Sequence, residues 1–239
     1  MIHLLLQYLV IVIIFTSPAN AQFHFVPAII QLSNGDTIDG WIDDAGLEST
    51  PNRIRFQQNP DERSGTFYYA YQISGFKMKD GVSYYSYTGD IDSAHIMVKK
   101  KKSTPKPQQF TDNMFMRVLV EGRVRLLYGT DKNHTAHYFL WPPKGTMEEL
   151  HYFQIISYSE GTTRGMYEDM QAHRTEKKLY KQQLLVAFAD NKAIYEKLAD
   201  ANVRYSKHDF IKWITAYNQS YREPAGTFSK PGNDAMGDQ

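Results

Sequence analysis

Three histidines are the residues whose type and spacing come closest to a metal site. His134 and His137 lie three positions apart, and His151 follows beside Glu148 and Glu149. Zinc needs three or four His, Cys or carboxylate donors that converge at about 2 Å from the ion. On a strand, residues three apart point to opposite faces, so His134 and His137 converge only if His134 lies in a loop. No H-E-x-x-H or C-x-x-C motif accompanies them, so we expect exposed histidines and no metal or cofactor, with these three as the candidate ligands.

A second polar stretch, GDIDSAH, carries Asp90, Asp92 and His95. These residues could imitate a calcium loop or the carboxylate pair of a hydrolase, but the spacing of an EF-hand loop is absent. We therefore expect a polar turn ahead of a strand. The chain also lacks a G-x-S-x-G elbow, a P-loop and a G-x-G-x-x-G turn. The paired carboxylates of glycoside hydrolases are spaced in three dimensions and not along the chain, so the sequence leaves that chemistry open.

A run of four lysines, Lys99, Lys100, Lys101 and Lys102, begins the stretch KKKKSTPKPQQ. Like charges repel one another and proline lacks a backbone donor, so residues 99–109 are expected to form an exposed linker or long loop. The alternative is that the lysines bind an anionic surface, such as lipid or polysaccharide. Screening by salt acts over about 8 Å, which weakens such binding at physiological ionic strength.

Trp41 is the aromatic residue that we single out as a binding candidate. It lies in IIQLSNGDTIDGWIDD, residues 29–44, where apolar and polar residues alternate as in strands with one buried face. Asn34-Gly35 between the two runs predicts a hairpin with a type I′ turn, because Asn and Gly tolerate positive φ best. Gly40 predicts a bulge or bend. Trp41 should be half-buried.

The elements that must position these side chains are mostly strands. Short alternating runs, bounded by turn residues, continue to about Tyr87 and predict an antiparallel small barrel or sandwich, similar in shape to SH3-like barrels. A further strand is expected at residues 94–98, and a second hairpin region at residues 115–128 turns at Glu121-Gly122. Residues 136–141 should be a strand, and residues 150–157 could be strand or helix. The fold class is therefore α+β.

Helical periodicity begins at about Tyr167. Tyr180, Leu184 and Phe188 are four residues apart and would share one face of a helix. A second short helix follows, and Ser206 should cap a third helix, with Asp209 three residues on as in a capping box. This third helix carries an apolar stripe that would pack on the strands or on the other helices.

Composition and the first residues indicate where the chain goes. Residues 1–21 have an apolar run, a Ser-Pro break and an Ala-Asn-Ala site, which predicts a secretory signal peptide cleaved after Ala21 and no transmembrane segment in the mature chain. The 27 basic and 26 acidic residues balance, which argues against nucleic-acid binding. The chain has no cysteine, and therefore no disulfide framework and no thiol nucleophile.

The predicted organisation has six parts: residues 1–21 as signal peptide, 22–98 as a β-rich module, 99–109 as linker, 110–165 as a second β region, 166–221 as a helical segment and 222–239 as a disordered tail. The sequence leaves open whether the two β regions form one sheet system or two.

The pattern of an aliphatic strand, N-G-D-T, an aliphatic residue, Gly and then I-D resembles the opening of uncharacterised exported proteins of Bacteroidetes. The similarity continues through residues 73–76, Asp80-Gly81 with Tyr84-Tyr85, Glu121-Gly122 with Leu127-Tyr128, and Tyr217-Asn218. It covers most of the mature chain. The resemblance implies export, and it brings no activity and no site residues.

These observations favour a non-catalytic binding or structural module of the cell envelope or extracellular space, whose partner is a protein or a glycan. Aromatic-rich strands are common at interfaces, and the chain has no recognisable catalytic motif. Two alternatives remain open. One is an extracytoplasmic hydrolase acting on a polymer, and the other is a binder of anionic surfaces through the four lysines.

Overall fold

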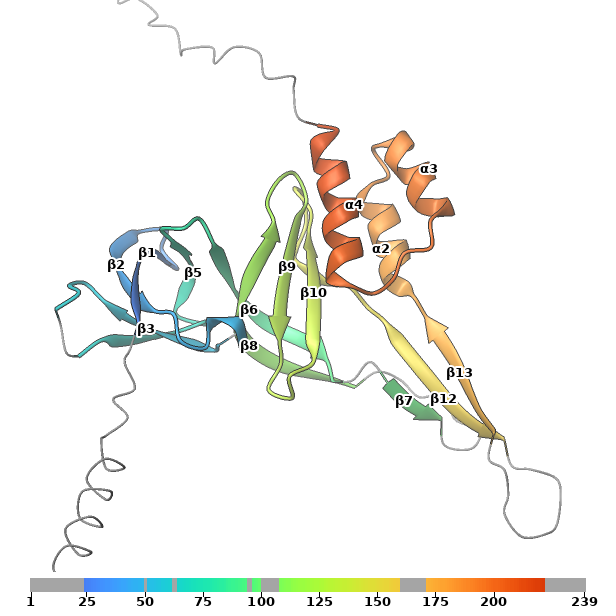
Figure 1. The fold of residues 1–239 in the computed structure, drawn as a ribbon, viewed down its shortest axis with the longest axis horizontal. Coiled ribbons are helices and arrows are strands. Elements are labelled where there is room, and N and C mark those ends of the chain that lie inside the picture. The colour runs from blue at the N-terminus through green and yellow to red at the C-terminus, as the bar shows by residue number, and fades with distance from the viewer. Residues whose placement is uncertain are drawn as a thin grey trace, which may run out of the picture.

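The structure is a computed structural model that describes residues 24–49, 51–61, 64–93, 96–99, 108–159 and 171–221. Within these ranges it is rich in antiparallel strands and ends in a helical segment, so the predicted α+β class is confirmed (Figure 1). The strands are β1 (Phe25–Leu32), β2 (Thr37–Asp43), β3 (Arg53–Gln57), β4 (Thr66–Tyr69), β5 (Ile73–Met78), β6 (Ser83–Asp92), β7 (Ile96–Lys99), β8 (Gln109–Val120), β9 (Arg125–Thr130), β10 (Ala136–Trp141), β11 (Glu148–Glu149), β12 (Phe153–Ser159) and β13 (Gln171–Lys177). The described helices are α2 (Leu179–Ala187), α3 (Lys192–Asp200) and α4 (Lys207–Gln219), with a 3-10 turn, η1, at Leu47–Ser49.

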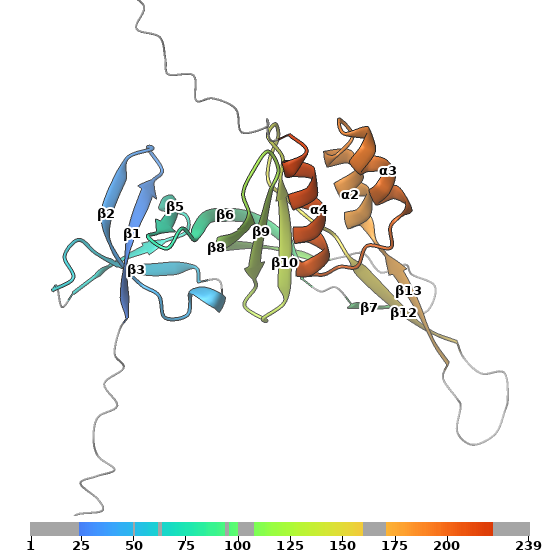
Figure 2. The same cartoon turned by 45° about the horizontal axis from the view of Figure 1, so that its top comes forward.

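Ten of the strands form one sheet in the order β11-β10-β9-β8-β6-β5-β1-β2-β3-β4. The two predicted β regions are therefore hydrogen-bonded to each other. The connection is the long pair β6–β8, whose register runs from Tyr84 opposite Arg117 to Asp92 opposite Gln109. Figures 1 and 2 show β1 to β5 curled at one end of the molecule, with β9, β10 and the helices at the other.

The first hairpin pairs β1 with β2, as the sequence predicts, and Trp41 is half-buried. The predicted type I′ turn is wrong, because among the described residues His134 is the non-glycine residue with positive φ. Gly35 alone carries the positive φ, +92°, and its N–H donates to the carbonyl of Leu32. This is a three-residue loop in which glycine takes the left-handed position, a solution that also fits an Asn-Gly sequence.

β8 separates two apolar cores. Phe115 packs with Ile30, Ile42 and other residues of β1 to β5, whereas its neighbours Met114 and Met116 point to the other side of the strand. Because side chains alternate along a strand, one long strand can serve both cores. β9 and β10 are likewise buried on both faces, with Met114 and Met116 on one side and the helices on the other.

The helices α2, α3 and α4 cover one face of β8 to β10 (Figure 1). Tyr180, Leu184 and Phe188 are fully buried there, as their spacing predicts. Ser206 caps α4, since its hydroxyl accepts a hydrogen bond from Asp209 N at 3.2 Å. None of the described helices combines the length and the apolar character that crossing a lipid bilayer requires.

Helical structure begins later than predicted. Residues 171–177 form strand β13, which pairs with β12, and α2 starts at Leu179. This stretch, QAHRTEK, has no apolar stripe for a helix to bury, and pairing with β12 satisfies its backbone groups. In the ambiguous stretch of residues 150–157, the residues from Phe153 on belong to strand β12. β7 lies parallel to β12 on its other edge, which confirms the strand predicted near residues 94–98.

Several predictions concern residues that the structure does not describe. The signal peptide of residues 1–21 and the tail of residues 222–239 lie outside the described ranges. So do Lys100, Lys101 and Lys102, whereas Lys99 ends β7.

Candidate functional site

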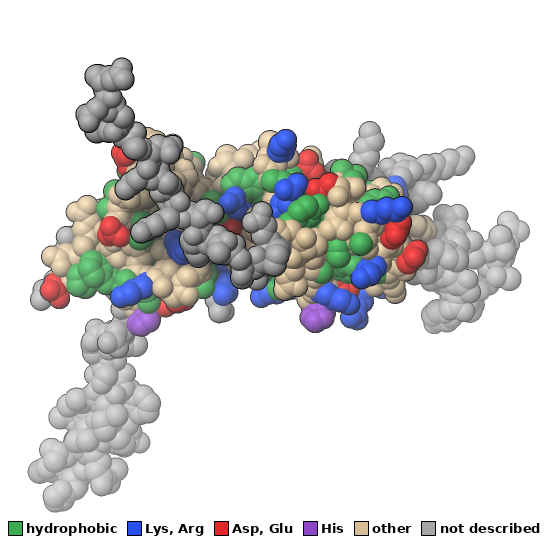
Figure 3. All heavy atoms as spheres, turned by 90° about the horizontal axis from the view of Figure 1, so that it is seen from above, with side chains coloured by type: hydrophobic (Ala, Val, Ile, Leu, Met, Phe, Trp, Pro, Cys, Tyr) green, Lys and Arg blue, Asp and Glu red, His purple; other side chains and the backbone are tan. Residues whose placement is uncertain are grey.

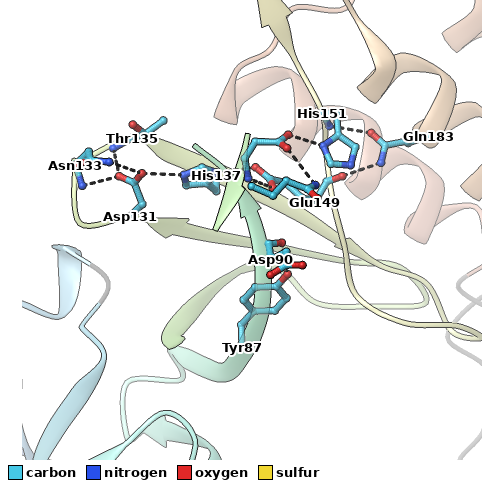
Figure 4. Close-up of polar contacts among 11 residues, drawn as sticks. Tyr87, Asp90, Asp131, Asn133, Thr135, His137, Glu149, His151 and Gln183 are labelled. Atoms are coloured by element: carbon cyan, nitrogen blue, oxygen red, sulfur yellow. Dashed lines mark hydrogen bonds and ion pairs between the residues drawn. The ribbon is translucent and has the colours of Figure 1, made fainter. Parts of the chain in front are cut away.

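Five ionisable side chains, Asp92, Asp131, His137, Glu149 and His151, follow one another in a continuous series of polar contacts, and we call them the acid–histidine cluster. They come from the end of β6, the turn after β9, the start of β10, and β11 with the residues that follow it. Figure 4 shows four of them, Asp131, His137, Glu149 and His151, following one another from the β9–β10 turn towards Gln183 of helix α2. The expectation of exposed histidines fails at His137, because β10 is covered on both faces and the side chain is inaccessible to solvent.

His137 lies between two carboxylates. Its Nδ1 is 2.6 Å from Glu149 Oε1, and its Nε2 is 3.7 Å from Asp131 Oδ2. An ionised carboxylate only accepts hydrogen bonds, so the proton at Nδ1 belongs to the imidazole. Asp131 is held in turn by the backbone N–H groups of Asn133 and Thr135, each at 2.8 Å from Oδ1. The turn, the strand and β11 are thereby joined through their side chains.

Asp92 and His151 form the more accessible end of the cluster. Asp92 Oδ2 lies 2.6 Å from His151 Nδ1, and the side chain of His151 is 30% exposed while that of Asp92 is 1% exposed. Gln109 Nε2 donates to Asp92 Oδ1 at 3.3 Å. The hydrogen bond with Asp92 raises the pKa of His151 above its ordinary value, against the opposing effect of burial. Solvent therefore reaches the cluster at His151.

Backbone and side-chain hydrogen bonds tie the two ends together. Asp92 N–H donates to Glu149 Oε2 at 2.9 Å. Gln183 of α2 accepts from His151 N–H at 2.9 Å and donates to Glu149 O at 2.7 Å. Burial, and then the negative charges of Glu149, Asp90 and Asp92, raise the pKa of Tyr87 to about 12. The negative potential thus extends beyond the five residues of the cluster.

Asp92, Glu149 and His151 each offer one donor atom, and these atoms lie within 4.8 Å of one another. Of the three histidines singled out in the sequence, His151 belongs to this group and His137 supports it through Glu149. His134 is in the β9–β10 turn, exposed and with φ of +61°. Asp92 was expected in a polar turn, with a calcium loop or a hydrolase carboxylate pair as alternatives, whereas it ends strand β6 and pairs with His151.

A second candidate region lies at the opposite end of the molecule, on the outer face of β2, β1 and β5. We call it the Trp41 groove, and its volume is about 620 Å³. Pro27, Ile29 and Trp41 contribute its apolar part, and Asp39 stands on the β2 side. On the face of the molecule that Figure 3 draws, which need not include the groove, the described basic and acidic side chains are interspersed and form no extended region of one charge.

The strand register places charges of opposite sign on the two sides of the groove. Ile29 lies opposite Asp39 on β2 and opposite Lys77 on β5. Pro27 lies opposite Trp41, and its carbonyl accepts a hydrogen bond from the N–H of Lys79. Residues opposite one another on adjacent strands share a face, so the lysine side and the aspartate side are separated by the apolar residues.

Comparison of the chain with known protein families, with curated proteins and with solved structures finds no match.

Proposed function

We propose that the protein is a non-catalytic binding module, and that the Trp41 groove takes an extended polypeptide segment that combines an apolar side chain with an acidic one. The observation that carries this proposal is the apolar, charge-flanked groove on the outer face of β2, β1 and β5.

The size and lining of the groove support a ligand of this kind. Ligand sites commonly enclose roughly 300–1,000 Å³ and combine an apolar lining with a few polar groups. Trp is the residue type that most often anchors binding energy, and Trp41 lies half-buried beside Pro27. Ile29 is 43% exposed, so a ligand side chain that covers it removes apolar surface from water.

The lining favours a polypeptide over a sugar. Pro27 and Ile29 present aliphatic surface, on which the hydroxyl groups of a sugar would lose hydrogen bonds to water without replacement. Lys77 and Lys79 lie on the β5 side and attract a carboxylate, whereas Asp39 repels one from the β2 side. An acidic residue of the ligand therefore points towards β5.

The alternative of a hydrolase has less support at this groove. Asp39 is the one carboxylate among its described lining residues. Retaining and inverting glycosidases both need two carboxyl groups that flank the scissile bond. Binding without catalysis is the simpler function for this lining.

Selection from a random peptide display library tests the proposal. The full chain serves as bait, with counter-selection against Trp41→Ser. We expect enriched sequences in which an aliphatic or aromatic residue lies near Asp or Glu. Synthetic peptides should bind the Trp41→Ser variant and the paired Lys77→Glu, Lys79→Glu variant at least 10-fold more weakly, and added salt should weaken binding.

Tyr71→Ser is the matched control, because Tyr71 is an exposed aromatic residue at the same end of the molecule and outside the groove. It should leave the affinity unchanged. Failure to recover any peptide that distinguishes the chain from Trp41→Ser would refute the proposal. Binding of a glycan from an array at the same residues would support the groove as a binding site but refute a polypeptide as its ligand.

We also propose that the protein acts outside the cytoplasm. Support comes from residues 1–21, with their apolar run and Ala-Asn-Ala site. Mass spectrometry of the protein recovered from its native cells should find an amino terminus at Gln22. An intact Met1 on the accumulated protein would contradict export by this route.

A further inference from the structure

The acid–histidine cluster carries an excess of buried negative charge. The side chains of Asp92, Asp131 and Glu149 are at most 3% exposed, and within the described ranges their ion pairs are all with His137 or His151. With all three carboxylates ionised, two imidazoles leave one negative charge without a partner even when both are protonated. Burying an uncompensated charge is unfavourable, so the site favours a bound cation.

The donor atoms that could hold such a cation are already together. One oxygen from Asp92, one from Glu149 and one ring nitrogen from His151 lie within 4.8 Å of one another. Two ligands about 2.1 Å from a tetrahedral ion are about 3.4 Å apart, so closing around an ion needs only small side-chain rotations. His151 is the partly exposed member, and an ion can enter from its side.

Each donor is also oriented by a second group, as is common at metal sites. His137 holds Glu149, and Asp131 holds His137. Gln109 holds Asp92 at 3.3 Å. The backbone at residues 149 and 151 is fixed by the single side chain of Gln183, which bonds both. The three donors are therefore held by β10, β8 and α2, and not by one flexible loop.

We propose that Asp92, Glu149 and His151 bind one divalent first-row transition-metal ion such as Zn²⁺ or Mn²⁺. The ion displaces the proton that His151 Nδ1 shares with Asp92 Oδ2, and these two atoms, 2.6 Å apart in the structure, separate to about 3.4 Å around it. Two carboxylates and one imidazole suit ions of this class, whereas Ca²⁺ needs six to eight oxygen ligands. The three protein ligands leave a coordination position for water or a further ligand on the His151 side.

The test is calorimetric titration of the untagged full chain, stripped with EDTA and then freed of chelator. We expect one Zn²⁺ or Mn²⁺ per chain with micromolar affinity or tighter, a rise in melting temperature with either ion, and no saturable binding of Ca²⁺. Asp92→Asn, Glu149→Gln and His151→Asn should each weaken binding at least 100-fold. His24→Asn is the matched control, because His24 pairs with Asp44 at 2.9 Å on the surface, far from the cluster in sequence, and should bind as the parent chain does.

His151→Asn keeps the test decisive even if the two more buried variants fail to fold, because its side chain is the most exposed of the three. Circular dichroism should show that this variant is folded. Zn²⁺ binding that is unchanged by His151→Asn would overturn the proposal. So would the lack of saturable binding of Zn²⁺ and Mn²⁺ at millimolar concentration, in which case the cluster is a hydrogen-bonded structural element alone.

Discussion

The two ends of the molecule handle polar groups in opposite ways. In the curled end formed by β1 to β5, the interior is apolar around Ile30 and Ile42, and the charged residues of the Trp41 groove stay at the surface. At the helical end, ionisable groups are buried beside an apolar core and pair with one another, with carboxylates outnumbering imidazoles. The first arrangement depends on the hydrophobic effect, and the second depends on every polar partner being present.

Removing one member of the buried cluster should have the largest effect on stability. His137→Ala leaves Asp131 and Glu149 buried without their imidazole, and loss of one partner of a buried pair typically lowers the free energy of unfolding by about 3–5 kcal/mol. Urea denaturation in the presence of EDTA measures this. His24→Ala removes an exposed imidazole and should change stability by about 0.5 kcal/mol or less. Equal losses for the two variants would show that the buried cluster is not a stabilising unit.

Asn218 offers a second, smaller test at the helical end. Its side-chain oxygen accepts from Val124 N–H at 2.9 Å and its amide donates to Val124 O at 2.8 Å, so α4 is attached to the start of β9 through both polar groups of one residue. Asn218→Ala leaves the buried Val124 N–H without this acceptor, and we expect a loss of about 1–3 kcal/mol in urea denaturation. Gln219→Ala, on the exposed side of α4, should have little effect. A loss of similar size in both variants would point to helix propensity and not to this contact.

At the curled end, the expected effects come from backbone conformation. Gly35 has φ of +92° with no atom within 4 Å of an added Cβ, so Gly35→Ala introduces strain without a clash. The left-handed conformation of an alanine costs roughly 1–2 kcal/mol. Gly35→Asn should be less destabilising, because Asn tolerates this conformation better. Thermal denaturation should therefore rank the parent chain first, the Asn variant second and the Ala variant third. The reverse order of the two variants would contradict the turn described here.

The smallest effect is expected for a polar contact at the surface of the helical end. Burial raises the pKa of Asp190, but hydrogen bonds from Tyr217, Tyr221 and Arg123 outweigh it and hold that pKa below its ordinary 3.8. A carboxyl with a depressed pKa stabilises the folded state above the unfolded pKa, and this contribution is lost as the pH falls through the folded pKa. The Arg123–Asp190 pair, at 3.0 Å, is exposed, so solvent screens it and its contribution should be the smallest of those considered. Asp190→Asn should destabilise at pH 6 and have less effect near pH 2.5; equal losses at both pH values would contradict this.

Local patterns in the sequence predicted local structure well. The hairpin around Asn34-Gly35 and the buried positions Tyr180, Leu184 and Phe188 depend on neighbours within a few residues. The acid–histidine cluster depends on pairs far apart in the chain, such as Asp92 and His151, 59 residues from each other. No spacing rule brings such residues together before the strand order is known. The strand at residues 171–177 was missed for the same reason, since its partner β12 decides its conformation.

The parallel pairing of β7 with β12 has a consequence for the order of folding. β7 leaves the main sheet between β6 and β8, and Ile96 finds its partner only at Gln154. Closing so long a loop is slow compared with forming a hairpin, because chain entropy is lost before the contact is gained. During synthesis, β7 cannot form its backbone hydrogen bonds with β12 until β12 has been made. The small sheet is therefore expected to assemble last, after the hairpins of β1 with β2 and β8 with β9 have formed.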